Sequence, residues 1–204
     1  MSDDFLSHVY TPRDADGVRK LYDDWSATYE REIGANGYAT PRRCAEALAT
    51  QTRDLSAPIL DFGCGTGLGG LALKLAGFES IDGCDLSSDM LAIARDKGLY
   101  RHTRLVEADE PLRHKPGTYA AIAAIGVIGL GAAPISVFDT IMDGLAPGGL
   151  FVFSFNDHAL TDPAFEGKVD NYIGSGRARL LSREHGDHLP AKNIKSTVYI
   201  LEKL

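Results

Sequence analysis

The chain has 204 residues, of which 44% are hydrophobic and 24% are charged, and this composition is typical of one compact globular domain with a buried core. The formal net charge of −7 argues against a nucleic-acid partner, because phosphate backbones are bound by clustered Lys and Arg. The sequence has no apolar run long enough to cross a bilayer, no secretory signal pattern, and no metal-ligand or disulfide spacing among its 3 cysteines, so we expect a cytoplasmic protein with no metal site and no membrane association.

The N-terminal quarter is predicted to be helical. Apolar and aromatic residues recur at helical spacing from Asp14 to about residue 33, and Thr40-Pro41 marks the start of a second helix that runs to about residue 51. The aromatic residues of the first helix share one face: Tyr22, Trp25 and Tyr29. We expect residues 1–55 to form helices ahead of an α/β core at 56–204, both within one domain.

A strand, a glycine-rich turn and a helix follow. The strand is predicted at 57–62, the helix at 68–76, and the turn between them reads Asp61-Phe62-Gly63-Cys64-Gly65-Thr66-Gly67. Glycines allow φ values that other residues avoid, and they let a ligand approach the backbone closely. The free N–H groups at the helix start then face the ligand.

Two classes of cofactor use such a turn. Gly65, Gly67 and Gly70 fit the dinucleotide-binding pattern G-x-G-x-x-G, with Asp85 about twenty residues further on. Asp61, however, ends the strand, where a carboxylate repels a pyrophosphate and attracts a cation. S-adenosylmethionine (SAM) carries an ammonium and a sulfonium and has no phosphate. The pattern therefore favours SAM over NAD(P).

The second and third strands are predicted at 80–86 and 101–108. Asp85 lies at the end of the second strand, where its carboxylate can accept both hydroxyl protons of an adenosine ribose. Asp82 lies earlier in that strand, and we expect it to face solvent or a polar edge. Ser87 is a good N-cap for the helix that ends near Lys97-Gly98.

The next elements extend a parallel sheet. Residues 118–126 form a nearly unbroken apolar run, as a strand buried on both faces requires, and a helix at 134–145 leads to a strand at 150–155. Asp157 and His158 follow that strand. His158 could be a general base for the acceptor, or it could simply belong to a turn that caps a helix.

The C-terminal residues complete the sheet. A short helix is predicted at 162–173, and strands at 179–183 and 197–202 form an antiparallel edge pair joined by a polar loop. His185 and His188 fall in that loop, and their spacing lacks the other ligands of a metal site.

Two motifs carry a family resemblance. Residues 61–67 resemble motif I of the class I SAM-dependent methyltransferases, and residues 84–91 (Cys-Asp-Leu-Ser-Ser-Asp-Met-Leu) resemble motif II. More narrowly, the chain is similar to the methyltransferase-like proteins of the Williams–Beuren syndrome region. The other matching segments span nearly the whole chain: residues 22–25, Tyr29, 37–41, 97–100, 145–149 and 196–203.

The resemblance implies a fold and a cofactor site. The fold is a doubly wound, Rossmann-like α/β domain with a mostly parallel seven-stranded sheet, an antiparallel last strand and an N-terminal helical lid. It implies that Asp85 binds the ribose, that Met90 supports the adenine, and that Asp109, or else Glu110, contacts the adenine edge. From the glycines after the fourth strand we expect Gly126 to let the backbone approach the methionine end. The implied cofactor-binding residues are Tyr22, Tyr29, Asp61, Gly63, Cys64, Gly65, Gly67, Asp85, Leu86, Met90, Asp109, Glu110 and Gly126.

One departure from the family is visible. Many relatives have Phe-Asp at the start of the fourth strand, where this chain has Tyr119-Ala120. The resemblance implies methyl transfer from SAM to a small-molecule acceptor, at O or N, with S-adenosylhomocysteine (SAH) as the product. A SAM-binding protein without catalysis and an NAD(P)-dependent oxidoreductase remain as alternatives, and neither the acceptor nor the oligomeric state can be predicted.

Overall fold

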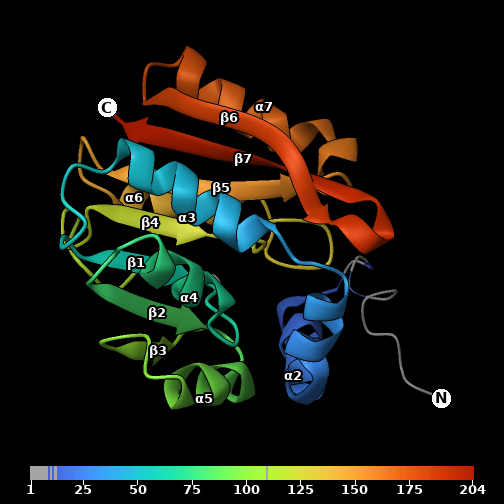
Figure 1. Cartoon of the computed structure of the whole chain (residues 1–204). Coiled ribbons are helices and arrows are strands. Elements are labelled where there is room, and N and C mark those ends of the chain that lie inside the picture. Colours follow the sequence, from blue (N-terminus) through green and yellow to red (C-terminus); the bar gives the residue numbers. More distant parts are fainter. Residues whose placement is uncertain (1–8, 10, 12, 109) are drawn as a thin grey trace.

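The computed structural model describes residues 9, 11, 13–108 and 110–204. Within these residues seven strands form one sheet in the order β3-β2-β1-β4-β5-β7-β6 (Figure 1). The strands are β1 Ile59–Phe62, β2 Ile81–Asp85, β3 Thr103–Leu105, β4 Ala121–Ala124, β5 Leu150–Asn156, β6 Ala178–Leu189 and β7 Ile194–Lys203. β7 is antiparallel to both of its neighbours and the other pairs are parallel. The sheet is therefore mixed, with the antiparallel last strand that the sequence predicts.

Helices cover both faces of the sheet and one of its ends. They are α2 Ala15–Ala35, α3 Thr40–Gln51, α4 Leu68–Leu75, α5 Ser88–Asp96, α6 Val137–Gly144 and α7 Pro163–Gly174, with 3-10 turns at Ala159–Thr161 and Pro190–Lys192. In Figure 1, α3 and α4 lie in front of the sheet, while α6 lies behind it. None of the helices in the described residues is long and apolar enough to cross a membrane.

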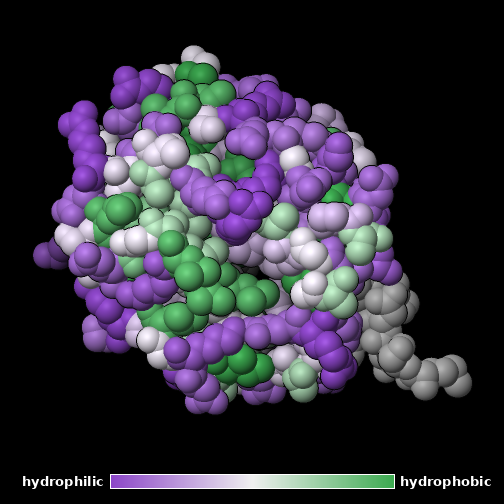
Figure 2. Space-filling view, viewed as in Figure 1, coloured by the Kyte–Doolittle hydropathy of each residue, from purple (hydrophilic) through white to green (hydrophobic). Residues whose placement is uncertain are grey.

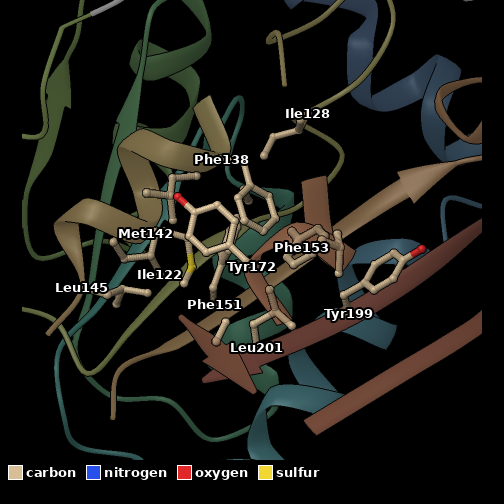
Figure 3. Close-up of a cluster of buried hydrophobic side chains, with 14 of the residues drawn as sticks. Ile122, Ile128, Phe138, Met142, Leu145, Phe151, Phe153, Tyr172, Tyr199 and Leu201 are labelled. Carbon is tan, nitrogen blue, oxygen red and sulfur yellow. The ribbon is translucent and has the colours of Figure 1, made fainter. Parts of the chain in front are cut away.

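Strand alternation divides the core into two layers. Phe151, Phe153 and Phe155 of β5 point to the layer that contains the buried side chains of α6 and α7, whereas Val152 points to the layer under α3 and α4. Figure 3 shows the first layer, in which Tyr199 stacks on Phe153 with ring centroids 4.9 Å apart. Period-2 alternation in the strands thus provides both apolar faces that the helices cover.

α2 lies across the carboxyl end of the parallel strands, beside α5 (Figure 1). Its start is fixed by Asp14, whose side chain accepts a hydrogen bond from the Gly17 amide at 2.8 Å, as an N-cap does. Trp25 is only 1% exposed and packs in a small core with Ile33 and Leu189. The predicted helix is therefore present, and its aromatic face is directed inward.

The C-terminal edge pair corrects one prediction. Residues 184–189, predicted as a polar loop, continue β6, so His185 and His188 lie in a strand and the connection is at 190–193. An edge strand can expose most of its side chains, so its sequence resembles that of a loop. The buried end of β6 is different: His188 is 7% exposed.

Asp82 was predicted to face solvent or a polar edge, and the structure shows a buried carboxylate with polar partners, which agrees with the second of these. Its two carboxylate oxygens accept hydrogen bonds from Arg101 Nε and Nη2, both at 3.0 Å, and Tyr119 Oη donates to it at 2.9 Å. Tyr119 stands where many relatives have Phe, and here its hydroxyl joins this pair. The third and fourth strands are also shorter than predicted, since only 103–105 and 121–124 are paired.

Candidate functional site

The site lies at the point where the strand order reverses. The chain runs from β1 outward to β2 and β3, and then returns to place β4 on the other side of β1. The loops after β1 and β4 consequently separate at the carboxyl end of the sheet, where ligands of open α/β sheets bind. A cavity of about 470 Å³ opens there, and both loops and α2 line it.

The glycine-rich turn forms one wall of this cavity. Gly63 and Gly65 have φ values of 70° and 53°, which side chains rarely adopt. The amides of Gly63 and Cys64 both donate to the Cys84 carbonyl oxygen, at 2.8 and 2.9 Å, and so anchor the turn to β2. A Cβ atom on Gly63 would lie 2.5 Å from Val127, whereas one on Gly65 would meet nothing. The turn is therefore packed behind Gly63 and open in front of Gly65.

Asp85 holds the turn from the end of β2. One of its carboxylate oxygens accepts from the Gly65 amide at 2.7 Å, and the other accepts from the Ser87 amide at 2.9 Å. Burial raises the pKa of Asp85, and these amide hydrogen bonds oppose that effect. Since each carboxylate oxygen has two lone pairs, both can still accept a ligand hydroxyl.

Asp61 is the second carboxylate of the site. It is 1% exposed, and its Oδ2 accepts a hydrogen bond from Tyr100 Oη at 2.7 Å. Burial raises the pKa of Asp61 to about 7, and the Tyr100 hydroxyl opposes that rise. A buried carboxyl group with a pKa near 7 is a good partner for a ligand cation, because the cation favours the carboxylate over the protonated form.

Tyr100 lies in a segment that matches the family, but the sequence analysis assigned it no role. Its hydroxyl donates to Asp61 and accepts from the Gly70 amide at 3.1 Å, so it joins the end of β1 to the first turn of α4. A Cβ atom on Gly70 would lie 2.4 Å from Tyr100, and one on Gly83 would lie 3.1 Å from its ring. Two glycines therefore make room for this tyrosine, although only the fold brings it beside them.

A buried hydroxyl on the cavity wall points to a polar ligand. Thr66 is 1% exposed, and its Oγ1 has no hydrogen-bond partner among the described residues. Leaving such a group unsatisfied costs about 1–3 kcal/mol. Open glycine backbone, an unpaired hydroxyl and the carboxylates of Asp61 and Asp85 beside the turn fit an adenosyl ligand that carries a cation better than they fit a pyrophosphate.

The structure brings most of the predicted cofactor residues together. Those that line the cavity are Tyr22, Tyr29, Asp61, Gly63, Cys64, Gly65, Asp85, Leu86, Met90, Glu110 and Gly126. Gly67 does not line it and instead forms the N-cap of α4 with a φ of 95°. Asp109 lies outside the described residues.

His158 does not line the cavity. It precedes the 3-10 turn at Ala159–Thr161, and its carbonyl oxygen accepts from the Thr161 hydroxyl at 2.7 Å. The structure thus places this residue in a turn, which is the second of the two interpretations that the sequence left open.

Other lining residues were missed because the chain brings them from afar. Tyr38 follows the glycine cluster before α3, and its Oη lies 2.3 Å from where a Cβ on Gly126 would be. Residues 132–134, 136 and 137, after β4, form another part of the wall. A glycine at the end of β4 was the one available signal that something packs closely there.

Comparison with known proteins agrees with this geometry. The sequence profile of the methyltransferase domain matches residues 36–198. The human methyltransferase-like protein 27 is 34% identical over 133 residues, which are 64% of this chain. The match is 54% of that protein, so the chain spans about half the length of this curated relative.

Solved structures of similar fold cover nearly the whole chain. The (4+2)-cyclase SpnF superposes with a TM-score of 0.71 at 17% identity, over 95% of this chain and 98% of that one. The magnesium protoporphyrin IX methyltransferase of Synechocystis PCC 6803 with bound SAH gives a TM-score of 0.67 at 14% identity, over 98% and 100% of the two chains. An S-adenosylmethionine-dependent methyltransferase from Clostridium acetobutylicum ATCC 824 gives 0.63 at 15% identity, over 89% and 98%. At these identities the likeness shows the fold.

The profile match extends from the end of α2 to β7 and so includes the glycine-rich turn, Asp85 and the loop after β4. These are the parts of the chain that build the cavity. The chain therefore belongs to the methyltransferase domain family, as a class I member whose cofactor is S-adenosylmethionine.

Proposed function

We propose that this protein transfers a methyl group from SAM to a small-molecule acceptor, at oxygen or nitrogen, and releases SAH. The observation that carries the proposal is the arrangement at the end of β1, where an open glycine turn is tied to Asp85 beside the buried Asp61. On the wall of one cavity, this arrangement offers carboxylate oxygens that can accept hydrogen bonds from hydroxyl groups, and a carboxylate that can pair with a cation.

Each wall of the cavity has a proposed role. Asp85 accepts the ribose hydroxyls, Met90 and Glu110 lie at the adenine end, and Asp61 attracts the cationic end of the cofactor. Tyr22 and Tyr29 of α2 close the cavity from outside. Gly126 marks the end at which the reacting methyl group and the acceptor meet.

When bound, SAM supplies an activated methyl group on a sulfonium. The protein then has to place an acceptor lone pair in line with that methyl carbon and to exclude water. Such chemistry needs a base only when the acceptor keeps a proton on its reacting atom. We assign no proton transfer to His158, because it does not line the cavity.

A SAM-binding protein without methyl transfer is the second candidate. The fold itself does not decide between them, since one of the solved structures that superpose on this chain is described as a cyclase. An NAD(P)-dependent oxidoreductase is less well supported, because Asp61 would face the pyrophosphate.

The test is release of SAH from SAM in the presence of a small-molecule extract filtered to exclude macromolecules. Methyl transfer predicts SAH release that requires both extract and protein and that is lost in Asp85→Ala. SAM binding without SAH release in any extract would favour the non-catalytic candidate. A deuterated methyl group on SAM would identify the acceptor by its mass.

A further inference from the structure

A second cavity, of about 60 Å³, adjoins the cofactor cavity. The two share lining residues from α2, from the segment before α3 and from the loop after β4: Tyr22, Tyr29, Tyr38, Gly126 and Ala132. One water needs roughly 10–15 Å³ of such space, so this cavity holds only a few non-hydrogen atoms. Its size suits the reacting group of an acceptor rather than a whole molecule.

Three polar side chains join the aromatic wall of this small cavity: Ser154, Asn156 and His188. Asn156 Oδ1 accepts from the Ala159 amide at 2.9 Å, and the NH₂ group of Asn156 can donate to a ligand. Ser154 Oγ accepts from the Gly126 amide at 3.0 Å and keeps its own proton to donate. Both side chains can therefore donate a hydrogen bond to a ligand.

A buried chain of hydrogen bonds orients His188. Its Nδ1 lies 2.8 Å from Thr40 Oγ1, which lies 2.9 Å from Ser196 Oγ, and Arg43 Nη1 donates to Ser196 Oγ at 3.1 Å. Thr40 and Ser196 are both 0% exposed. Because an arginine only donates, the direction Arg43 to Ser196 to Thr40 to Nδ1 gives every hydroxyl proton a partner.

In the opposite direction Nδ1 would donate to Thr40 and Thr40 would donate to Ser196. The hydroxyl proton of the buried Ser196 would then have no acceptor among the described residues. The chain therefore places the imidazole proton on Nε2, which bonds to no described residue. Burial lowers the pKa of His188 to about 4; Asp157 opposes this shift, and Arg43 and His158 add to it. His188 is thus a neutral ring that presents an N–H donor.

We propose that the small cavity is the acceptor subsite and that it takes the oxygen of a carboxylate, which accepts hydrogen bonds from His188 Nε2, Asn156 and Ser154. The proposal rests on the methyl transfer proposed above. A carboxylate oxygen would bond to the methyl carbon as the bond from that carbon to sulfur breaks. The charges on oxygen and sulfur then cancel, and no proton has to move, which agrees with a site that holds no evident base.

Trp25 lines the small cavity and is the single tryptophan of the chain, so its fluorescence reports on this site. The experiment titrates the SAH-saturated protein with benzoate and with benzylamine, which share a ring and differ in charge. Benzoate should change the Trp25 signal, and benzylamine should not. His188→Phe should weaken benzoate binding about tenfold, as loss of a hydrogen bond to a charged group does, and His188→Gln should restore much of it.

His185→Ala is the matched control, since this exposed histidine of the same strand lines neither cavity. It should leave benzoate binding unchanged, and SAH affinity should be the same in all three variants, which also shows that they fold. Binding of benzylamine in preference to benzoate, no response to benzoate, or equal benzoate affinity in His188→Phe would overturn the proposal. Failure of the wild type to bind SAH would count against the proposed function alone, because the benzoate titration can also be read without SAH.

Discussion

Asp61 is almost fully buried, and it faces a cavity that we propose to hold a cation. Burial favours the protonated carboxyl and raises its pKa to about 7, whereas a cation favours the carboxylate. Cofactor binding and ionisation of Asp61 are therefore expected to be coupled. With a pKa of about 7, Asp61 changes its charge near neutral pH, so the coupling should be measurable there.

SAM affinity should rise between pH 6 and pH 8. With a pKa near 7, the charged fraction of Asp61 grows from about a tenth to about nine tenths over this range, so the dissociation constant should fall by up to about tenfold. Calorimetric titration across this range measures the effect, with Asp61→Asn as the comparison. An equal pH dependence in Asp61→Asn would show that another group is responsible.

At the scale of elements, the contact between Tyr100 and α4 holds the glycine turn in place. Gly70→Ala should destabilise the protein by about 1–3 kcal/mol, because the new Cβ would meet the Tyr100 ring at 2.4 Å and force repacking. Urea unfolding monitored by circular dichroism gives the free energy of unfolding.

Gly167→Ala is the matched control for this substitution. Gly167 also lies inside a helix, α7, but a Cβ there would have nothing within 4 Å. It should stabilise the protein by about 0.5–1 kcal/mol, since glycine in a helix has more conformational freedom to lose on folding. If the two substitutions changed stability in the same direction, the packing argument would be wrong.

α2 is the element proposed to close the cofactor cavity. Tyr29→Ala should weaken SAH binding roughly tenfold, as removal of one stacked aromatic ring does, with a smaller effect on stability. Asp24→Ala, on the exposed side of α2, should leave the affinity unchanged. Unchanged SAH affinity in Tyr29→Ala would remove α2 from the site.

The elements and the cofactor turn could be predicted because they depend on neighbours in sequence. Helical spacing found α2, a nearly unbroken apolar run found β4, and the motif at residues 61–67 located the cavity. Tyr100 and His188 could not be predicted, since their partners lie 39 and 148 residues away. β6 was predicted too short because an edge strand with solvent on one side carries a polar sequence.

At the scale of the whole molecule, the fold fixes where a ligand binds and leaves the reaction to the loops. Solved structures described as methyltransferases and one described as a cyclase superpose on this chain over most of its length. The position of the cofactor cavity follows from the strand order and from the turn after β1, and both are features of the fold. We propose that the residues around the small cavity determine the acceptor, and for these residues the fold alone gives no prediction.

The central claim is that the cavity between the β1 and β4 loops binds SAM through Asp85. Calorimetric titration of the protein with SAM, SAH and NAD⁺ tests it most directly, on the wild type, on Asp85→Ala and on the exposed control Asp89→Ala. We expect one site for SAM and SAH, none for NAD⁺, and at least about tenfold weaker binding in Asp85→Ala alone, because two hydrogen bonds to a charged group are lost. Binding of NAD⁺ without SAM, or SAM affinity unchanged in Asp85→Ala, would contradict the account.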